Sequence, residues 1–490
     1  MKLRDLYRDS LSLLTDFYQL TMACGYWKEG LKDSEAVYHL HYRKNPFKGG
    51  FAVACGLESV IEFLDDFHFD ESDLDYLSNL KDFDGNPYFP GEFLQYLGDM
   101  KFECDVDAIP EGTVVFPQES LLRVKGPIIQ CQLLESPLLN LVNFPTLIAT
   151  KGARVSMAAK GDKVLEFGLR RAQGIDGAVT ASRSSYIGGC HGTSNVLAGK
   201  MFGIPVSGTH AHSWITAFDE ELESFYAFAR AMPGNTIFLV DTFDTIEGVK
   251  KAIEVGKWLK ENGRKFYGIR LDSGDLAYLS IESRKLLDNA GFEETKIVAS
   301  NELDETVISD LKKQGAQIAV WGVGTNLATA KDQPALDGIY KLSAVKHKGK
   351  DWQHKLKLSE QMIKISNPGI LQVRRFSNEY GNIADVIYDE LLPPPEQWTV
   401  VDPLDPTRQK TLPDSAESQD LLVPIFQKGK LCYRSPPIDE MREKTIKGLK
   451  KFHSGIKRFL NPHQYVVGLE RNLYQIKVKI IKEIREKVNQ

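Results

Sequence analysis

A repeating alternation of short apolar strands and helix-like segments constrains the fold of this chain more than any other feature. Between about residues 163 and 330, apolar runs typical of strands end in polar or glycine-rich residues, and a segment with helical periodicity follows each run. The polar ends fall at His212, Asp241, Asp272, Asn301 and Gly322, in steps of 29, 31, 29 and 21 residues. Such steps fit one strand, one helix and two loops, so the spacing predicts parallel β/α units.

Parallel β/α units either close into a barrel or form an open, doubly wound sheet. In both arrangements the carboxyl ends of the strands lie along one rim, so the polar strand ends should converge there. The number of consecutive units favours the barrel. We therefore predict an α/β protein built on an irregular, TIM-like β/α barrel, with an N-terminal α+β domain and a C-terminal extension.

The length of 490 residues is too great for one compact core. We expect an N-terminal α+β domain over residues 1–150, the barrel over 151–345 and a C-terminal region over 346–490. Proline-rich stretches near 392–396 and 402–406 predict extended segments in the last region. The final fifty residues carry thirteen Lys or Arg against four Glu. Apolar residues recur among them at helical spacing, which favours a solvated helical face over a nucleic-acid-binding tail.

Charge and cysteine usage exclude several classes of protein. A formal net charge of −5 weakens the case for nucleic acid or an anionic membrane as a partner. The six cysteines form no CxxC pair, so neither a zinc knuckle nor a disulfide framework is indicated, and a cytoplasmic location fits best. No apolar run approaches the ~18 residues of a membrane span, and charges interrupt the N-terminal segment. We expect no membrane anchor and no export signal.

The run Gly322-Val323-Gly324-Thr325 directly follows an apolar strand. Glycines allow backbone N–H groups to approach phosphate oxygens, and a helix beginning after them would add a favourable dipole. A Gly-x-Gly turn after a strand can also be ordinary turn chemistry. Its late position in a barrel, where phosphate is often bound, favours a phosphate site.

Arg270, Asp272 and Asp275 stand together at another strand end. Charged groups there are costly unless they bind a ligand or one another. Asp272 could accept both hydroxyls of a ribose and Arg270 could bind an anion, or the three could form an ion pair that caps the next helix. We interpret Asp275 as a structural helix cap and the other two as functional.

His210 and His212 in the segment GTHAHSW allow two interpretations. A His-x-His pair at a barrel strand end is one way in which metal-dependent hydrolases present two metal ligands. Further histidine ligands at other strand ends are missing, however, so we predict no metal held by the protein alone. The alternative is a histidine nucleophile or phosphoryl acceptor at His212, oriented by a carboxylate such as Asp241. The role of His210 stays open.

The segment EFGLRRAQG, residues 166–174, adds Phe167, Arg170 and Arg171 at a further strand end. An aromatic face beside guanidinium groups suits a flat, anionic heteroaromatic acid. A core phenylalanine with surface arginines is the alternative.

Taken together, these motifs resemble the nicotinate phosphoribosyltransferase family of barrel-type phosphoribosyltransferases. The resemblance covers nearly the whole chain. It rests on residues 15–22 (TDFYQLTM), 42–47 (YRKNPF), 110–113 (PEGT), 166–174, 208–214, 270–276 (RLDSGDL), 322–325, 357–360 (KLSE) and 461–469 (NPHQYVVGL). It implies nicotinate and phosphoribosyl pyrophosphate as substrates, Mg²⁺ and ATP as cofactors, a C-terminal region packed on the N-terminal domain, and a homodimer with shared active sites.

The resemblance also implies roles for individual residues. His212 is similar to the family histidine that ATP phosphorylates, and Asp241 would orient it. Phe167 would stack on the pyridine ring, with Tyr18 of the partner subunit on its other face. Arg170 and Arg270 would meet the carboxylate and pyrophosphate, and Asp272 the ribose. The remaining phosphate contacts would come from Arg43, Arg171, Asn301, Gly322, Val323, Gly324, Thr325, Lys341 and Lys357.

Ser194 bears on the choice between acid and amide. Related nicotinamide enzymes carry an aspartate near this position, whereas residues 191–194 of this chain include no carboxylate. A carboxylate would repel nicotinate, so its absence fits the acid. The expected activity is therefore the ATP-coupled formation of nicotinate mononucleotide. A nicotinamide phosphoribosyltransferase and a metal-dependent amidohydrolase are the rival hypotheses.

Overall fold

The computed structural model describes residues 10–488 and divides the chain into two compact units. Unit 1 joins the chain up to Leu147 with the chain from Ala335 onward, and unit 2 comprises the residues between them. The first nine residues, part of the basis for expecting no export signal, lie outside the described range. Within residues 10–488, no helix is long and apolar enough to cross a membrane. The three sequence regions expected above stay a prediction.

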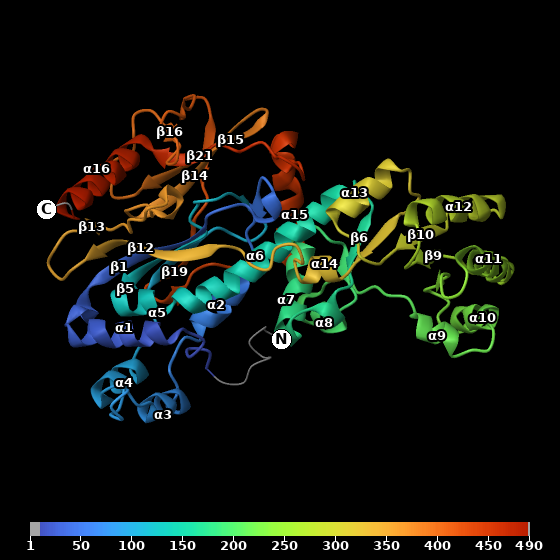
Figure 1. Cartoon of the computed structure of the whole chain (residues 1–490), viewed down its shortest axis with the longest axis horizontal. Coiled ribbons are helices and arrows are strands. Elements are labelled where there is room, and N and C mark those ends of the chain that lie inside the picture. Colours follow the sequence, from blue (N-terminus) through green and yellow to red (C-terminus); the bar gives the residue numbers. More distant parts are fainter. Residues whose placement is uncertain (1–9, 489–490) are drawn as a thin grey trace. The chain divides into compact units, whose positions relative to one another are not determined.

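Unit 2 is built on a sheet of six parallel strands (Figure 1). In spatial order the strands are β7 (Gly192–Thr193), β6 (Lys163–Glu166), β11 (Val320–Val323), β10 (Lys296–Ala299), β9 (Gly268–Leu271) and β8 (Ile237–Leu239). Their interior side chains are fully buried, among them Trp321, Phe238 and Ile269. The predicted alternation of strands and helices is confirmed. The strand expected before His212 is wrong, because Val206, which belongs to its apolar run, forms only an isolated bridge with Thr193.

Helices separate the strands of unit 2 along the chain. They are α7 (Gly174–Ile187), α8 (Val196–Phe202), α9 (His212–Thr216), α10 (Glu221–Ala231), α11 (Thr245–Glu261), α12 (Leu276–Asn289), α13 (Glu305–Lys313) and α14 (Thr325–Ala328). Local sequence explains their ends. Asp275 accepts the backbone N–H groups of Ala277 and Tyr278 and so caps α12, which confirms its predicted structural role. Helix α11 ends at Asn262 and Gly263, where a positive φ of 66° suits glycine.

A buried ion cluster holds α13 against α6 (Glu135–Ala158), the helix that contains the boundary between the units. Glu305 lies 2.7 Å from Lys151 Nζ and 2.7 Å from Arg154 Nε, and all three side chains are at most 5% exposed. Removal of one member would leave a buried charge without its partner. This cluster therefore holds α13 in place on α6.

Unit 1 contains two large sheets and a two-stranded one. The first sheet, in spatial order, consists of β13 (Gln353–His354), β12 (Gly338–Lys346), β1 (Glu35–Tyr42), β5 (Leu122–Pro127), β3 (Asp105–Ala108), β19 (Val423–Gln427) and β20 (Lys430–Leu431). The second consists of β17 (Gln409–Thr411), β16 (Thr399–Val401), β21 (Val467–Glu470), β15 (Gly381–Asp389), β14 (Leu371–Asn378) and β18 (Glu417–Asp420). The third pairs β2 (Ala52–Val53) with β4 (Val114–Val115). Segments far apart in the chain thus share one sheet.

Unit 1 also contains helices. They are α1 (Phe17–Lys28), α2 (Leu57–Asp65), α3 (Glu71–Asn79), α4 (Gly91–Gly98), α5 (Ile128–Leu133), α15 (Ile438–Lys450) and α16 (Arg471–Val488). Helix α5 packs on β1 and β5, and α16 packs on β16 and β21. The proline-rich stretch after β15 is irregular, and the last described residues form helix α16, as the sequence predicts.

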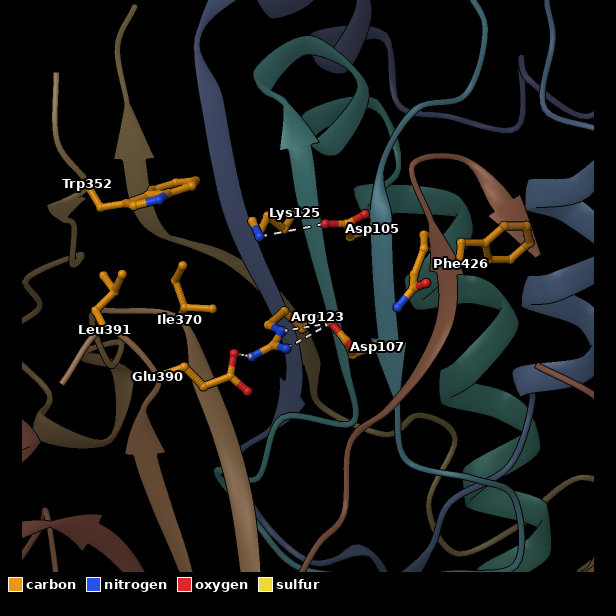
Figure 2. A pocket seen from close by; sticks show the side chains of 10 residues that line it. Asp105, Asp107, Arg123, Lys125, Trp352, Ile370, Glu390, Leu391 and Phe426 are labelled. Carbon is orange, nitrogen blue, oxygen red and sulfur yellow. Dashed lines mark hydrogen bonds and ion pairs between the residues drawn. The ribbon is translucent and has the colours of Figure 1, made fainter. Parts of the chain in front are cut away.

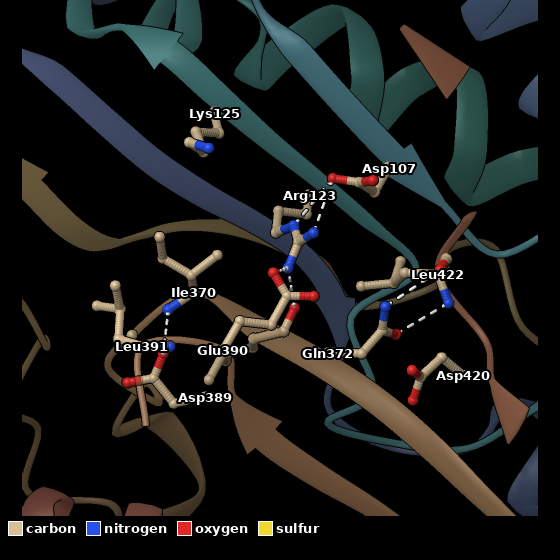
Figure 3. A network of polar contacts seen from close by, with 12 residues as sticks. Asp107, Arg123, Lys125, Ile370, Gln372, Asp389, Glu390, Leu391, Asp420 and Leu422 are labelled. Carbon is tan, nitrogen blue, oxygen red and sulfur yellow. Dashed lines mark hydrogen bonds and ion pairs between the residues drawn. The ribbon is translucent and has the colours of Figure 1, made fainter. Parts of the chain in front are cut away.

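Arg123 ties the two large sheets of unit 1 together (Figure 3). From β5 it donates to Asp107 on β3 at 2.9–3.0 Å and to the Leu371 carbonyl of β14 at 3.1 Å, and it pairs with Glu390 at 2.8 Å. A cavity of about 370 Å³ lies beside this network, with Trp352 on its wall (Figure 2). Its charged side chains pair with one another, so this network serves mainly to connect the sheets.

Candidate active site

A cavity of about 440 Å³ lies at the carboxyl ends of the strands of unit 2. Its lining includes the residues that end or follow β6, β7, β8, β9, β10 and β11. Of the predicted site residues it contains Phe167, Arg170, Arg171, Ser194, His212, Arg270, Asp272, Asn301, Gly322, Gly324 and Thr325. The convergence predicted from parallel strands is therefore observed, and its volume suits a small organic ligand.

Arg270 and Asp272 form the polar centre of this cavity. Arg270 donates from Nη2 to Asp272 Oδ1 at 2.8 Å and from Nε to Ser300 Oγ at 2.8 Å. Its Nη1 donates to Thr209 Oγ1 at 3.2 Å. All three guanidinium nitrogens thus bind protein groups, which makes Arg270 a support for Asp272 rather than an open anion site.

Asp272 is kept ionised by these contacts. Burial raises the pKa of its carboxyl, but the hydrogen bond from Ser300 and the charge of Arg270 outweigh burial, so the pKa lies below its ordinary value. Ser300 Oγ forms a short hydrogen bond to Oδ1. Oδ2 lies 3.8 Å from His212 Nε2, so the second oxygen of a firmly held anion lies close to the imidazole.

His212 begins α9, and its side chain is 44% exposed. Nδ1 lies 3.0 Å from Thr242 Oγ1, which leaves Nε2 on the side of Asp272. The expected contact with Asp241 is wrong. Asp241 instead accepts the backbone N–H of Asp272 and the hydroxyl of Ser273, both at 2.7 Å, because the turn after β9 brings these donors to it. Asp241 therefore orders the loop that carries Asp272.

Phe167, the residue after β6, lies directly over Gly322 of the neighbouring strand β11. A Cβ at Gly322 would lie 2.6 Å from the phenyl ring, so only glycine allows the ring this position. Gly324 follows β11 and precedes α14, which matches the predicted turn between strand and helix. Asn301, at the end of β10, has a φ of 108°, a strained value of the kind that clusters at functional sites.

His210 is packed rather than free to bind a metal ion. It is 7% exposed, and its Nε2 accepts the backbone N–H of Leu239 at 3.2 Å. Burial lowers its pKa to about 4, so the ring is neutral. No group of three or more His, Cys, Asp or Glu within residues 10–488 is arranged to hold a metal ion. The Nε2 of His210 is occupied by a backbone N–H and is not open to a metal ion beside His212.

Comparison with known proteins shows the family of this chain. Models of the nicotinate phosphoribosyltransferase (NAPRTase) N-terminal domain, family and C-terminal domain match residues 13–143, 163–366 and 370–477. The nicotinate phosphoribosyltransferase of Bacillus subtilis (strain 168) is 40% identical over 98% of this chain and 97% of that protein. This chain belongs to the nicotinate phosphoribosyltransferase family. The human nicotinic acid phosphoribosyltransferase crystal structure matches it with a TM-score of 0.83 and 32% identity, over 95% of this chain and 99% of that one.

Four residues assigned through the resemblance to the nicotinate phosphoribosyltransferase family belong to unit 1. Tyr18 lies on α1 and is 49% exposed. Arg43 follows β1, and its buried Nε has no hydrogen-bond partner among the described residues. Lys341 on β12 pairs with Glu135 at 3.5 Å. Lys357 is exposed, and only its backbone is held, by Ser366 Oγ at 2.9 Å.

Sequence analysis missed two side chains of unit 2 that contact the predicted site residues. Thr242 contacts His212, and Ser300 contacts both Arg270 and Asp272. Each is the sequence neighbour of a predicted strand end: Thr242 follows Asp241, and Ser300 precedes Asn301. That position is the signal that could have found them. Val323 was predicted to bind phosphate, but its side chain is fully buried and does not line the cavity.

Proposed function

We propose that this protein joins nicotinate to the ribose of phosphoribosyl pyrophosphate, releasing pyrophosphate and forming nicotinate mononucleotide. Family membership supports the activity, and one observation supports its location. An aromatic ring, an ionised carboxylate and an imidazole with an open Nε2 line a single cavity, at Phe167, Asp272 and His212. The chemistry needs little proton transfer, so positioning and charge stabilisation dominate.

Phe167 would stack on the pyridine ring of nicotinate. The pyridine nitrogen would attack the anomeric carbon of the ribose as the bond from that carbon to pyrophosphate breaks. Asp272 would accept the ribose hydroxyls and stabilise positive charge on the sugar. Arg170 is exposed in the cavity and has no ion pair with a described residue, so we assign the substrate carboxylate to it. The donors of Arg270 are already engaged, which is why we prefer Arg170.

The phosphate contacts follow the same reasoning. We assign the 5′-phosphate to the backbone at Asn301, Gly322, Gly324 and Thr325, near the start of α14, and to Arg171. We assign the pyrophosphate to Arg43, Lys341 and Lys357. Mg²⁺ would bind mainly to donor phosphate oxygens, with the open Oδ2 of Asp272 as a suitable protein ligand, and would neutralise charge on the leaving group.

ATP coupling would run through His212. Nε2 would attack the γ-phosphorus of ATP, forming an N–P bond while the bond to ADP breaks; water would later cleave the N–P bond and release phosphate. Nδ1–H would donate to Thr242 Oγ1, which fixes the tautomer with its lone pair on Nε2. Hydrolysis of this intermediate would draw the reaction toward the nucleotide.

Finer features of fold and assembly are part of the proposal. We infer that unit 2 is an irregular barrel, since segment 206–211 joins β7 through the Thr193–Val206 bridge. It reaches β8 through Asn235 Nδ2, which donates to the Gly208 carbonyl at 2.9 Å, and through His210.

We also propose a cytoplasmic homodimer in which Tyr18 of the partner subunit covers the pyridine ring. Mixing Tyr18→Ala and His212→Asn subunits should restore activity if sites are shared.

The deciding experiment combines nicotinate, phosphoribosyl pyrophosphate and Mg-ATP and measures nicotinate mononucleotide and ADP together. His212→Asn should lose ATP hydrolysis and its coupling yet keep slow, ATP-independent transfer. Full ATP-stimulated turnover in that variant would refute the role of His212. Comparison of kcat/KM for nicotinate and nicotinamide tests the acid against the amide, and preference for the amide would overturn the substrate assignment.

A further inference from the structure

Lys477 is a buried lysine in the basic C-terminal helix. Helix α16 buries Leu473, Lys477 and Ile481, which are four residues apart and therefore lie on one face. Lys477 is 5% exposed, whereas Lys479 on the same helix is 76% exposed. Burial of a charged amine costs more free energy than burial of an apolar side chain. A lysine at this position therefore suggests a functional role.

The contacts of Lys477 are polar but contain no carboxylate. Nζ donates to Asn367 Oδ1 at 2.7 Å and to the Ile365 carbonyl at 3.5 Å, and it forms no ion pair with a described residue. Burial lowers its pKa to about 8. Its positive charge at neutral pH is therefore held by dipoles alone.

These contacts connect Lys477 to Lys357. Residues 365–367 are buried, at 2%, 4% and 5% exposure, so Lys477 fixes a segment inside unit 1. The middle residue of that segment, Ser366, accepts the backbone N–H of Lys357 at 2.9 Å. One side of the segment is thus held by α16, and the other holds the backbone of Lys357.

Lys477 also belongs to a group of cations around His41. The pKa of this buried imidazole is held at about 3 by burial and by the positive charges of Arg43, Lys341 and Lys477. Within residues 10–488, the buried Nε of Arg43 has no hydrogen-bond partner, and Lys341 pairs with one carboxylate, that of Glu135, at 3.5 Å. Positive charge here exceeds nearby negative charge, which favours a bound anion.

We propose that Lys477 is a positioning residue for the binding of the diphosphate of the donor, acting through residues 365–367 on Lys357 and through its charge on the group at His41. The basic C-terminal helix is then part of donor binding rather than only a solvated face. The inference rests on the proposed function, which assigns Arg43, Lys341 and Lys357 to the pyrophosphate.

The test compares full-length Lys477→Met and Lys477→Arg with wild type. Lys479→Met is the matched control, since Lys479 lies one half-turn away, is exposed and has only a 3.9 Å ion pair with Glu483. Lys477→Met should raise the KM for phosphoribosyl pyrophosphate about tenfold or more, the value of one charge-assisted hydrogen bond. The KM for nicotinate should change less than about twofold, Lys477→Arg should recover part of the donor affinity, and the control should match wild type.

Thermal unfolding with and without inorganic pyrophosphate gives a readout independent of turnover. Pyrophosphate should raise the melting temperature of wild type and of the control, and this shift should be reduced in Lys477→Met. If Lys477→Met does not fold, Asn367→Ala removes the same hydrogen bond from the other side and should raise the donor KM in the same way. The inference is overturned if the folded variants keep both the wild-type donor KM and the wild-type rise in melting temperature with pyrophosphate. The proposed transferase activity would not be affected by that result. Absence of transferase activity in wild type would instead refute the proposed function.

Discussion

The contact between Phe167 and Gly322 allows a sharp prediction, because one methyl group should displace the ring that we propose binds the substrate. In Gly322→Ala the new carbon would lie 2.6 and 2.7 Å from two ring carbons of Phe167 and 3.5 Å from Ser300 Cβ. Carbon atoms in contact stay at about 3.5 Å or more, so the ring must retreat by about 1 Å. The backbone of Gly322 has no positive φ, so the substitution acts through the ring alone.

The size of the effect follows from this displacement. Overpacking of a tight contact costs about 1–3 kcal/mol of stability. A substrate-positioning group that is about 1 Å out of place can lower the rate by ~100-fold. We therefore expect kcat/KM for nicotinate to fall by about 10- to 100-fold in Gly322→Ala, with a smaller effect on the KM for phosphoribosyl pyrophosphate.

Steady-state kinetics with each substrate varied in turn measures both parameters. Gly177→Ala in α7 is the matched control, because a Cβ there has no atom within 4 Å, and it should retain wild-type kinetics. In a Phe167→Leu background the smaller side chain leaves room for the methyl group, so Gly322→Ala should then cost much less. If Gly322→Ala alone keeps kcat/KM within about twofold of wild type, the ring either is not held there or does not bind the substrate.

Three further predictions concern other contacts. Thr242→Val removes the hydroxyl beside His212 and should lower ATP-coupled turnover about three- to tenfold, measured as ADP formed per nucleotide; unchanged coupling would count against tautomer control. Burial raises the pKa of Glu119 well above its ordinary 4.5, so folded protein binds a proton that the unfolded chain loses, and stability falls as pH rises above about 4.5. Glu119→Gln should flatten that fall between pH 5 and pH 7 in denaturant unfolding, and an unchanged slope would contradict this account. Glu305→Ala removes the buried carboxylate shared by two cations of α6, of which Lys151 keeps Asp332 at 2.9 Å, and should cost about 3–5 kcal/mol in the same assay; a loss below about 1 kcal/mol would show that the cluster is not important.

Local sequence patterns predicted much of unit 2. The strands that precede Asp241, Asp272, Asn301 and Gly322 and the cap at Asp275 follow from periodicity and turn chemistry, which act over a few residues. The convergence of Phe167, Asp272 and Gly322 then follows from parallel strands sharing one rim. The error at Val206 has the same origin, since its sequence resembles a strand but its neighbours allow only a bridge.

The sequence by itself determined the family, the order of β/α units and which residue types reach the rim, because these depend on local periodicity and on motifs. Tertiary structure alone decided which partner each side chain has. It placed Thr242 rather than Asp241 beside His212, and it engaged Arg270 with Ser300. It also joined β1 to β12 and β3 to β19 across some 300 residues and buried Lys477 beside Asn367. Such contacts depend on side-chain direction and long-range strand pairing, for which no local pattern in the chain carries a signal.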